Sequence, residues 1–295
     1  MTQVLRAKHI IGEVVLDEHG KIVDHPSRKS VPDADPKTYP SVLRALKDRR
    51  FFADMRLKNL ELTKRQVRES VSQDLFIIQS INSIEELDRC SNMTSKRLRE
   101  WAGWWVPELE RSVSDHAVFA RLVAGKDWPA LLEESKVKKD ESMGVDLAKR
   151  DVDVIKSQAA AVEGIMSARG LLESYLKSSM QESCPNLMAL AGHLIGAKLI
   201  AHAGSIRHLS ELPSSTIQIL GAEKALFRHL LTGAKPPKYG VIYSHPLVQS
   251  ARRSDQGRVA RALADKISIA VKVDFFKGEF IGEKLKRDLE ERFRR

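Results

Sequence analysis

The stretch Gly221–Lys224, which reads GAEK, holds the residues whose types and spacing most directly suggest chemistry. The glycine interrupts a run from Ser214 to Leu230 that would otherwise form one helix. Because glycine readily adopts the left-handed conformation that ends helices, we expect one helix to stop after Leu220 and another to begin near Ala222. The first amide groups of a helix have no partner within it, and the helix dipole attracts anions there. The spacing therefore predicts an anion-binding turn.

The side chains beside this turn add to the prediction. Lys224 and Arg228 are four residues apart, so they share one face of the second helix. Glu223 can accept hydrogen bonds from amino or amide groups, and the small side chain of Ala222 permits a close approach. An ordinary corner between two helices, with no ligand, is the alternative interpretation of the same residues.

The positive charge of the chain is concentrated in the same region. The net charge is +10, and residues 186–295 contain 19 Lys and Arg against 10 Asp and Glu, which accounts for nearly all of it. A basic surface attracts phosphate backbones and makes binding depend on salt. We therefore expect a nucleic acid as the partner, with a merely solvated basic face as the alternative.

The sequence contains none of the motifs that would indicate an enzyme. It has no phosphate-binding glycine loop, no dinucleotide-binding loop and no hydrolase nucleophile motif. Its nine histidines are scattered, and Cys90 and Cys184 match no metal or redox spacing. No run approaches the roughly 20 apolar residues of a membrane span. We predict no catalytic residue, metal site, cofactor or membrane partner, and a reducing cytosol as the compartment.

Two long helices are expected ahead of the basic region. From about residue 62, apolar residues recur at spacings of three and four, as in Val67, Val71, Leu75, Ile78 and Ile81. A second helix is expected from about Asp140 to Ser183. Every seventh residue there forms the series Leu147, Val154, Ala161, Ala168 and Tyr175. Beside that series lie Ile155, Val162, Ile165, Leu172 and Leu176.

These two patterns predict an antiparallel coiled-coil hairpin, and an exposed hairpin stripe is a candidate dimer surface. A plain helical bundle is the alternative. The residues assigned to the coiled coil and its dimer surface are Val71, Leu75, Ile78, Val154, Ile155, Val162, Ile165 and Leu172.

The N-terminal region has a different composition. Residues His9–Asp24 predict a β-hairpin, with IIGEVVL as a strand, DEHG as the turn and KIVD as the return strand. A proline-rich connector, His25–Pro40, follows, and Ser41 is placed to cap a helix that begins at Val42. The expected fold is mainly α, with a small α/β domain over residues 1–61, a coiled-coil domain over 62–184 and an all-α domain over 185–295.

Five segments, in this order, resemble the Nop family: RLREWAGWWVPEL, AGHLIGAKLIAHAGS, SSTIQILGAEKALFRHL, PPKYGVIYSHPLV and GRVARALADKISIAVKVDFF. The first lies in the predicted coiled coil and the others in the C-terminal region, so the resemblance extends from about residue 62 to 295. The chain resembles the archaeal Nop-family scaffold of box C/D guide ribonucleoproteins. The segment GEVVLDEHGKIVDH is similar to that family's opening strands.

The resemblance implies a role without catalysis. In that family the Nop domain binds guide RNA together with a kink-turn-binding ribosomal-type protein, and the coiled coil makes a homodimer. The N-terminal domain holds fibrillarin, the methyltransferase that uses S-adenosylmethionine, and the assembly methylates ribose 2′-hydroxyls of rRNA and tRNA. Only about 60 residues precede the coiled coil here, fewer than the family usually has, which leaves fibrillarin binding open.

The resemblance also places GAEK at the junction of RNA and protein. The residues predicted to bind RNA are Gly221, Ala222, Glu223, Lys224, Arg228, Gln256, Arg258 and Arg261. Arg258 and Arg261 are three apart on one helix face, whereas Arg252 and Arg253 lie in a loop where solvation is an equal interpretation. These contacts are expected to read RNA shape and backbone more than base sequence.

Several other functions are compatible with the sequence. Within the family, the alternative is a spliceosomal-type RNA scaffold. From other classes, the alternatives are an enzyme that modifies RNA directly and a purely structural coiled-coil dimer. The absence of a long Lys- and Glu-rich tail favours an archaeal, cytoplasmic protein, and a eukaryotic one would be nucleolar.

Overall fold

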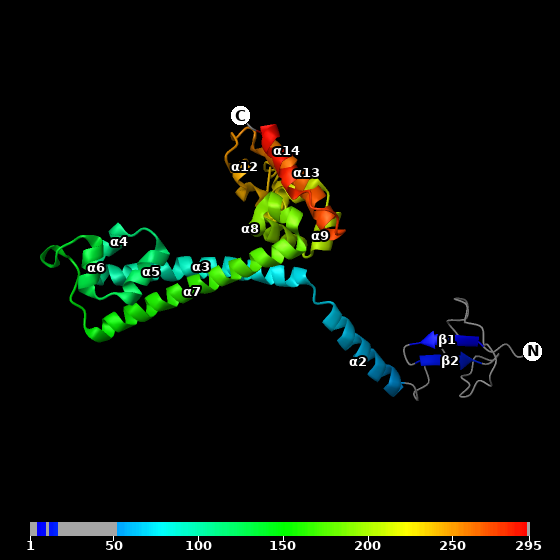
Figure 1. Ribbon diagram of the computed structural model, residues 1–295, viewed down its shortest axis with the longest axis horizontal. Coiled ribbons are helices and arrows are strands. Elements are labelled where there is room, and N and C mark those ends of the chain that lie inside the picture. Colours follow the sequence, from blue (N-terminus) through cyan, green and yellow to red (C-terminus); the bar gives the residue numbers. More distant parts are fainter. Residues whose placement is uncertain (1–4, 10–11, 17–51, 294–295) are drawn as a thin grey trace, which may run out of the picture. The chain divides into compact units, whose positions relative to one another are not determined.

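The computed structural model describes residues 5–9, 12–16 and 52–293 and confirms the mainly α fold (Figure 1). The chain divides into two compact units, Met1–Ser72 and Gln73–Arg295. This break falls later than the start of the coiled coil expected at residue 62, and the functional domain boundaries remain predictions. The proline-rich connector, the cap at Ser41 and the return strand KIVD lie outside the described residues.

The first unit contains a β-hairpin formed with a strand that the sequence analysis did not predict. Strand β1 (Leu5–His9) pairs antiparallel with β2 (Gly12–Leu16), from Leu5 opposite Leu16 to His9 opposite Gly12. The predicted strand GEVVL therefore pairs with the preceding LRAKH, which also alternates apolar and basic residues. The unit also contains α2 (Phe52–Glu69), none of whose side chains is buried.

The expected single stripe from Val67 to Ile81 is broken. Helix α2 ends at Glu69 and α3 (Gln73–Trp105) begins four residues later, so Val71 lies between the two helices. The Ser70 hydroxyl donates to the Val67 carbonyl at 2.7 Å, a side-chain bond that competes with helix continuation. The assignment of Val71 to the coiled coil was therefore wrong.

The buried face of α3 is also displaced from the predicted one. Leu75 is exposed and Ile78 half-buried, whereas Ile77, Ile81 and Ile84 are the residues that pack inside. A long-range contact fixes this rotation, because the Asp74 carboxylate accepts from the Ile206 amide at 3.0 Å. Leu75 therefore does not belong to the interior of the hairpin.

The antiparallel hairpin itself is confirmed. Helix α3 runs beside α7 (Lys149–Ser183) over most of their lengths (Figure 1). Helix α7 begins later than the expected Asp140, because the preceding segment is tied to the far end of α3. There Val145 N–H donates to the Trp104 carbonyl at 2.8 Å. Between the long helices lie α4 (Pro107–Ser112), α5 (His116–Gly125), α6 (Trp128–Ser135) and a 3-10 turn (Lys139–Glu141).

The seven-residue series of α7 faces away from the interior. Val154 is 50% exposed, and Ala161, Ala168 and Tyr175 are exposed as well. The flanking series is the buried one, with Ile155 and Val162 inside and Ile165 and Leu172 half-buried. Helix α7 packs on both α3 and α5, and these two neighbours decide which series turns inward.

The second unit has two hydrophobic cores. One lies at the tip of the hairpin, where α3 and α7 enclose Leu109, Phe119 and Leu131 with α4 to α6. The other surrounds α13 (Gln256–Phe275) in the C-terminal region. Its other elements are α8 (Pro185–Ala203), α9 (Ile206–Glu211), α10 (Ser214–Ile219), α11 (Glu223–Thr232), the 3-10 turn η4 (Val241–Ser244), α12 (Pro246–Gln249) and α14 (Gly282–Phe293).

One buried carboxylate joins three of these helices. The Asp274 carboxylate accepts from the backbone amides of Asn186 and Leu187, at 3.0 and 2.8 Å, and from the Asn186 side chain at 2.8 Å. The Asn186 side-chain oxygen in turn accepts from the Ile281 amide at 2.6 Å. Burial raises the pKa of Asp274 although these bonds oppose the rise. The start of α8, the end of α13 and the start of α14 are thereby fixed together.

Within the described part of the chain, no helix combines the length and the apolar character that a membrane crossing requires.

Candidate nucleic-acid interface

The predicted helix interruption is present, and we call residues 219–223 the Gly221 corner. Helix α10 ends at Ile219, Gly221 has a left-handed φ of +88°, and α11 starts at Glu223. A Cβ atom at position 221 would lie 2.5 Å from Val241 Cγ2 and 3.3 Å from His202 Nε2. Glycine is therefore required for two reasons: the backbone adopts a left-handed conformation, and there is no space for a Cβ atom.

Backbone contacts with the loop before η4 hold the corner in place. Gly240 N–H donates to the Gln218 carbonyl at 2.9 Å, and Val241 N–H donates to the Leu220 carbonyl at 2.8 Å. The Gln218 side chain returns a bond to the Lys238 carbonyl at 2.7 Å. A Cβ atom at Gly240 would sit 1.9 Å from the Leu220 oxygen, so this close pairing also needs glycine.

Glu223 has a different role from the one expected. Its carboxylate accepts from Gly221 N–H at 2.7 Å and lies 3.5 Å from His202 Nδ1. Partial burial disfavours the charged carboxylate, but the amides of Gly221 and Glu223, together with His202, outweigh burial and lower the pKa of Glu223. The chain's own carboxylate therefore occupies part of the anion site that the sequence predicts at the start of α11. Glu223 therefore stabilises the corner through Oε1, and its role as an RNA contact stays a prediction.

The basic side chains of α11 are available to a ligand. Lys224 and Arg228 are exposed, and within residues 52–293 neither takes part in an ion pair. Ala222 is half-buried at the turn, as its small size predicted. The geometry places two cations on a helix whose first turn follows a rigid backbone corner, a suitable arrangement for phosphate groups.

Sequence reasoning missed the apolar surface of α11. No side chain of this helix is buried, and Phe227, Leu230 and Leu231 are 62%, 68% and 84% exposed. Their spacing of three and one resembles an ordinary core stripe, so it gives no sign of exposure. Three adjacent large apolar side chains on one exposed helix mark a candidate protein-docking face.

The second predicted group lies at the start of α13. Gln256 is only 9% exposed, and its side-chain oxygen accepts from the Tyr239 hydroxyl at 2.9 Å. Gln256 therefore supports the loop that holds the corner, contrary to its expected place on the surface. Arg258 and Arg261 are exposed, and Arg258 pairs with Asp255 at 3.3 Å.

Within the described residues, no group of three or more His, Cys, Asp or Glu side chains is arranged to hold a metal ion. Cys184 is buried, and burial raises the pKa of its thiol, which disfavours the reactive thiolate. His193 lies 3.0 Å from Glu173 and so pairs with α7 instead of joining His202 and His208.

Comparison with known proteins supports this description. A family profile described as "Nop: snoRNA binding domain, fibrillarin" matches residues 83–295. A NOP5 family protein of Methanocaldococcus jannaschii is 39% identical over 257 residues, which is 82% of this chain. Nucleolar protein 56 of Homo sapiens is 40% identical over 240 residues, or 74% of this chain. Nucleolar protein 58 of Sclerotinia sclerotiorum is 42% identical over 215 residues, or 68% of this chain.

The matches cover only part of those relatives. They span 62% of the archaeal protein, 40% of the human one and 38% of the fungal one. A solved structure entitled a fibrillarin/Nop5p complex aligns over 98% of both chains, with 21% identity and a TM-score of 0.49. The profile alone covers well over half of the chain, and the archaeal relative is similar over most of it. The chain therefore belongs to the Nop family, whose shared region is a snoRNA-binding domain.

Proposed function

We propose that the chain is a scaffold of a box C/D ribonucleoprotein that guides ribose 2′-O-methylation of rRNA or tRNA. Its C-terminal region binds guide RNA together with a kink-turn-binding protein. The observation that carries this proposal is the Gly221 corner, where a fixed backbone turn leads into a helix with exposed Lys224 and Arg228. Family membership supplies the class of RNA.

The RNA contacts are proposed to come from two helix starts. Lys224 and Arg228 bind phosphates from α11, and Arg258 and Arg261 do so from α13. Gly221 contributes by allowing the tight turn that sets the start of α11, since Val241 and His202 fill the space beside its Cα atom. The binding is predominantly electrostatic, so it weakens as salt is added.

The exposed apolar face of α11 is proposed to dock the kink-turn-binding protein. A protein bound to the same RNA would meet α11, because the cations and the apolar side chains Phe227, Leu230 and Leu231 belong to one ten-residue helix. Binding of RNA and protein at one helix would make each partner strengthen the other. Neither alone is then expected to bind as tightly as both together.

The chain is proposed to lack catalytic activity of its own. The family description names fibrillarin, and we propose that this methyltransferase is recruited as a partner and brings the S-adenosylmethionine. The chain itself then needs no cofactor. Methyl transfer by the chain and RNA alone, with S-adenosylmethionine added, would contradict this assignment. The proposed compartment is the cytoplasm in an archaeon and, since a human relative is named a nucleolar protein, the nucleolus in a eukaryote.

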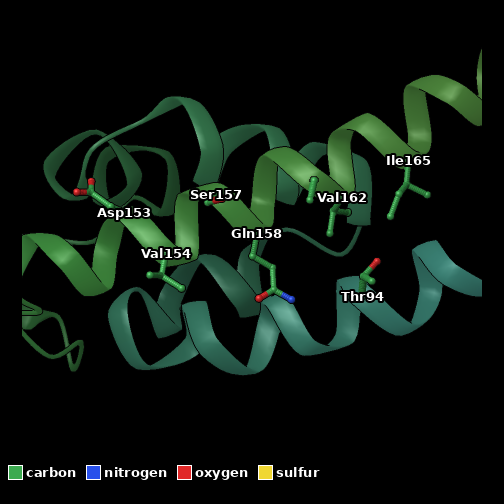
Figure 2. A pocket seen from close by; sticks show the side chains of 8 residues that line it. Thr94, Asp153, Val154, Ser157, Gln158, Val162 and Ile165 are labelled. Carbon is green, nitrogen blue, oxygen red and sulfur yellow. The ribbon is translucent and has the colours of Figure 1, made fainter.

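A homodimer is proposed to form through the outward face of the hairpin. A hollow of about 500 Å³, here called the hairpin hollow, lies along α7 beside α3 and includes Val154, Val162 and Ile165 (Figure 2). A second hollow of about 700 Å³ shares Thr94 and Gln158 with it, so the two form one groove. The exposed seven-residue series of α7 runs along this groove, which suits a second copy of the same helices.

A gel-shift experiment tests the RNA-binding proposal. A box C/D RNA is titrated with the protein, with and without the kink-turn-binding protein, for the wild type and for Lys224→Glu. We expect tight binding only with the partner present, and a loss of about 100-fold in Lys224→Glu. Lys177→Glu, the same charge reversal at an exposed lysine of α7, is the matched control and should bind like the wild type. Binding that is indifferent to both the partner and Lys224 would contradict the proposal.

A further inference from the structure

A second basic site lies between the loop after α12, the start of α13 and the end of α14. Arg252, Arg258 and Arg292 line a hollow of about 280 Å³, here called the arginine hollow. Its apolar lining comes from Leu247, Ala251, Val259 and Phe293. A water molecule occupies about 30 Å³ of liquid, so the hollow has room for a group much larger than one water.

The charges around the arginine hollow favour an anion. Among the described residues, three arginines and one carboxylate, that of Asp255, line the hollow, and Asp255 pairs with Arg258 at 3.3 Å. The hollow lies at the start of α13, where the positive end of a 20-residue helix dipole adds to the same potential.

We propose that the arginine hollow binds a phosphodiester group of the RNA, which makes the last helix, α14, part of the RNA-binding surface. Guanidinium groups bind phosphate oxygens in a bidentate manner, and arginines from separate elements can hold one phosphate from several directions. The inference rests on the proposed function, since the RNA is the same guide RNA. It assigns a ligand to Arg252 and Arg292, neither of which belongs to the α11 surface.

A chain of contacts connects the arginine hollow to the Gly221 corner. Gln256 follows Asp255 directly and holds Tyr239, whose ring stacks on Tyr243 with centroids 4.7 Å apart. Gly240, the residue after Tyr239, donates its N–H to the carbonyl of Gln218 in α10, just before the corner. Both sites therefore belong to one rigid framework, on which a single RNA strand can make contacts at α11 and at the hollow.

The sequence provides matched controls on both elements. Arg253 follows Arg252 in the same loop, and Arg287 lies on α14 with Arg292, yet neither Arg253 nor Arg287 lines the hollow. Four variants, Arg252→Gln, Arg292→Gln, Arg253→Gln and Arg287→Gln, thus remove the same charge inside or outside the hollow. All four sites are exposed, and thermal unfolding followed by circular dichroism should show equal stability.

The measurement is the salt dependence of RNA affinity for the full chain with the kink-turn-binding protein. We expect Arg252→Gln and Arg292→Gln to weaken binding about five-fold or more. Each should also reduce the slope of log affinity against log salt by about 0.7 to 0.9, the amount for one lost phosphate contact. Arg253→Gln and Arg287→Gln should keep the slope of the wild type.

If all four variants share the wild-type slope while Lys224→Glu abolishes binding, the proposal for the arginine hollow is overturned and the scaffold function stands. The hollow would then be assigned to an acidic protein segment. Equal losses in all four would also overturn it, because they would show a diffuse basic surface. A wild-type chain that fails to bind the RNA would instead remove the proposed function, and this inference with it.

Discussion

The Gly221 corner and the hairpin hollow are both proposed as binding surfaces, yet they are built in opposite ways. At the corner, backbone bonds and two glycines fix the shape, and the binding side chains Lys224 and Arg228 project into solvent. In the hairpin, apolar side chains fix the shape, and the same helix that buries Ile155 and Val162 exposes Val154.

Because of this difference, the substitutions that affect stability and those that affect only binding are of different kinds in the two regions. At the corner, adding a methyl group at a glycine changes the shape, whereas removing an exposed cation should change only the binding. On the hairpin, truncating a buried side chain reduces stability, whereas adding a charge outside should change only the association. Four predictions follow this contrast, beginning with the helices of the C-terminal core.

The largest effect is expected at Asp274, which holds the start of α8, the helix whose other end contacts the corner through His202. Asp274→Ala removes the acceptor of three hydrogen bonds and leaves the amides of Asn186 and Leu187 buried without it. Leaving a buried donor without its acceptor costs about 1–3 kcal/mol, and three donors are affected here, so we expect a loss of at least about 3 kcal/mol in the free energy of unfolding. Urea denaturation measures it.

Asp274→Asn is the control for this change. Its amide keeps one oxygen acceptor and has almost the same volume, so its loss should be clearly smaller than that of alanine. The chain has two separate hydrophobic cores, and Asp274 belongs to the one around α13. The loss of stability is therefore expected in that core and not in the core at the tip of the hairpin. A loss below about 1 kcal/mol in Asp274→Ala would show that these bonds contribute no more than ordinary exposed ones.

A smaller effect is expected at the corner itself. Gly221→Ala adds about 1–2 kcal/mol of backbone strain at φ +88°, and its Cβ atom would meet Val241 Cγ2 at 2.5 Å. The loop must move to relieve that contact, so we expect RNA affinity in the gel shift to fall about ten-fold or more. Gly233→Ala is the matched control, because φ is +68° there and a Cβ atom meets nothing within 4 Å. Equal RNA affinity of the two variants would refute the importance of the close contact.

The corner was predictable from sequence because its cause is local. A glycine between two helical runs, followed by basic residues four apart, requires no knowledge of distant segments. The roles of Glu223 and Gln256 were not predictable in this way. Gln256 is buried because Tyr239, in a loop 17 residues earlier, reaches its side chain. Glu223 was expected to accept from a ligand, but its carboxylate faces the corner and His202 of α8.

The hairpin shows what apolar periodicity in a sequence does not determine. Two long antiparallel helices follow from apolar periodicity, but periodicity cannot say which of two neighbouring series is buried. Val154 and Ile155 both recur within seven-residue patterns, and only the joint packing of α3 and α5 on α7 turns Ile155 inward. In the same way, Asp74 and its contact with α9 set the rotation of α3, which displaced Leu75 from the interior.

The third prediction concerns association through the hairpin hollow. Val154→Glu places a charge on an exposed apolar side chain of the hollow, next to Asp153. We expect the dimer dissociation constant to rise at least ten-fold, about 1.4 kcal/mol, in sedimentation equilibrium. Thermal stability of the monomer and its RNA affinity should stay unchanged. Leu171→Glu, on the same helix outside the hollow, is the control. A wild-type chain that sediments as a monomer would reject the dimer.

The smallest effect is a pH dependence of stability in the framework of the corner. His245 caps α12 through Leu247 N–H, and its Nε2 lies 3.0 Å from the Leu190 carbonyl. Burial, above all, lowers the pKa of His245, and the facing residues of α14 act in opposite directions, Lys286 lowering it and Glu290 raising it. The folded chain therefore keeps the imidazole neutral, whereas the unfolded chain takes up a proton near pH 6.5.

Because the unfolded state binds more protons in this range, the His245 contribution to stability should be constant above about pH 7.5 and fall as the pH is lowered through 6.5. One group contributes at most about 1.4 kcal/mol per pH unit. Urea denaturation of the wild type and of His245→Gln, at pH 7.5 and 5.5, isolates that contribution. The glutamine variant should lose less stability on acidification than the wild type. If the two lose equal amounts of stability, groups other than His245 cause the pH dependence. The buried histidine then does not make the helices around the corner sensitive to acid.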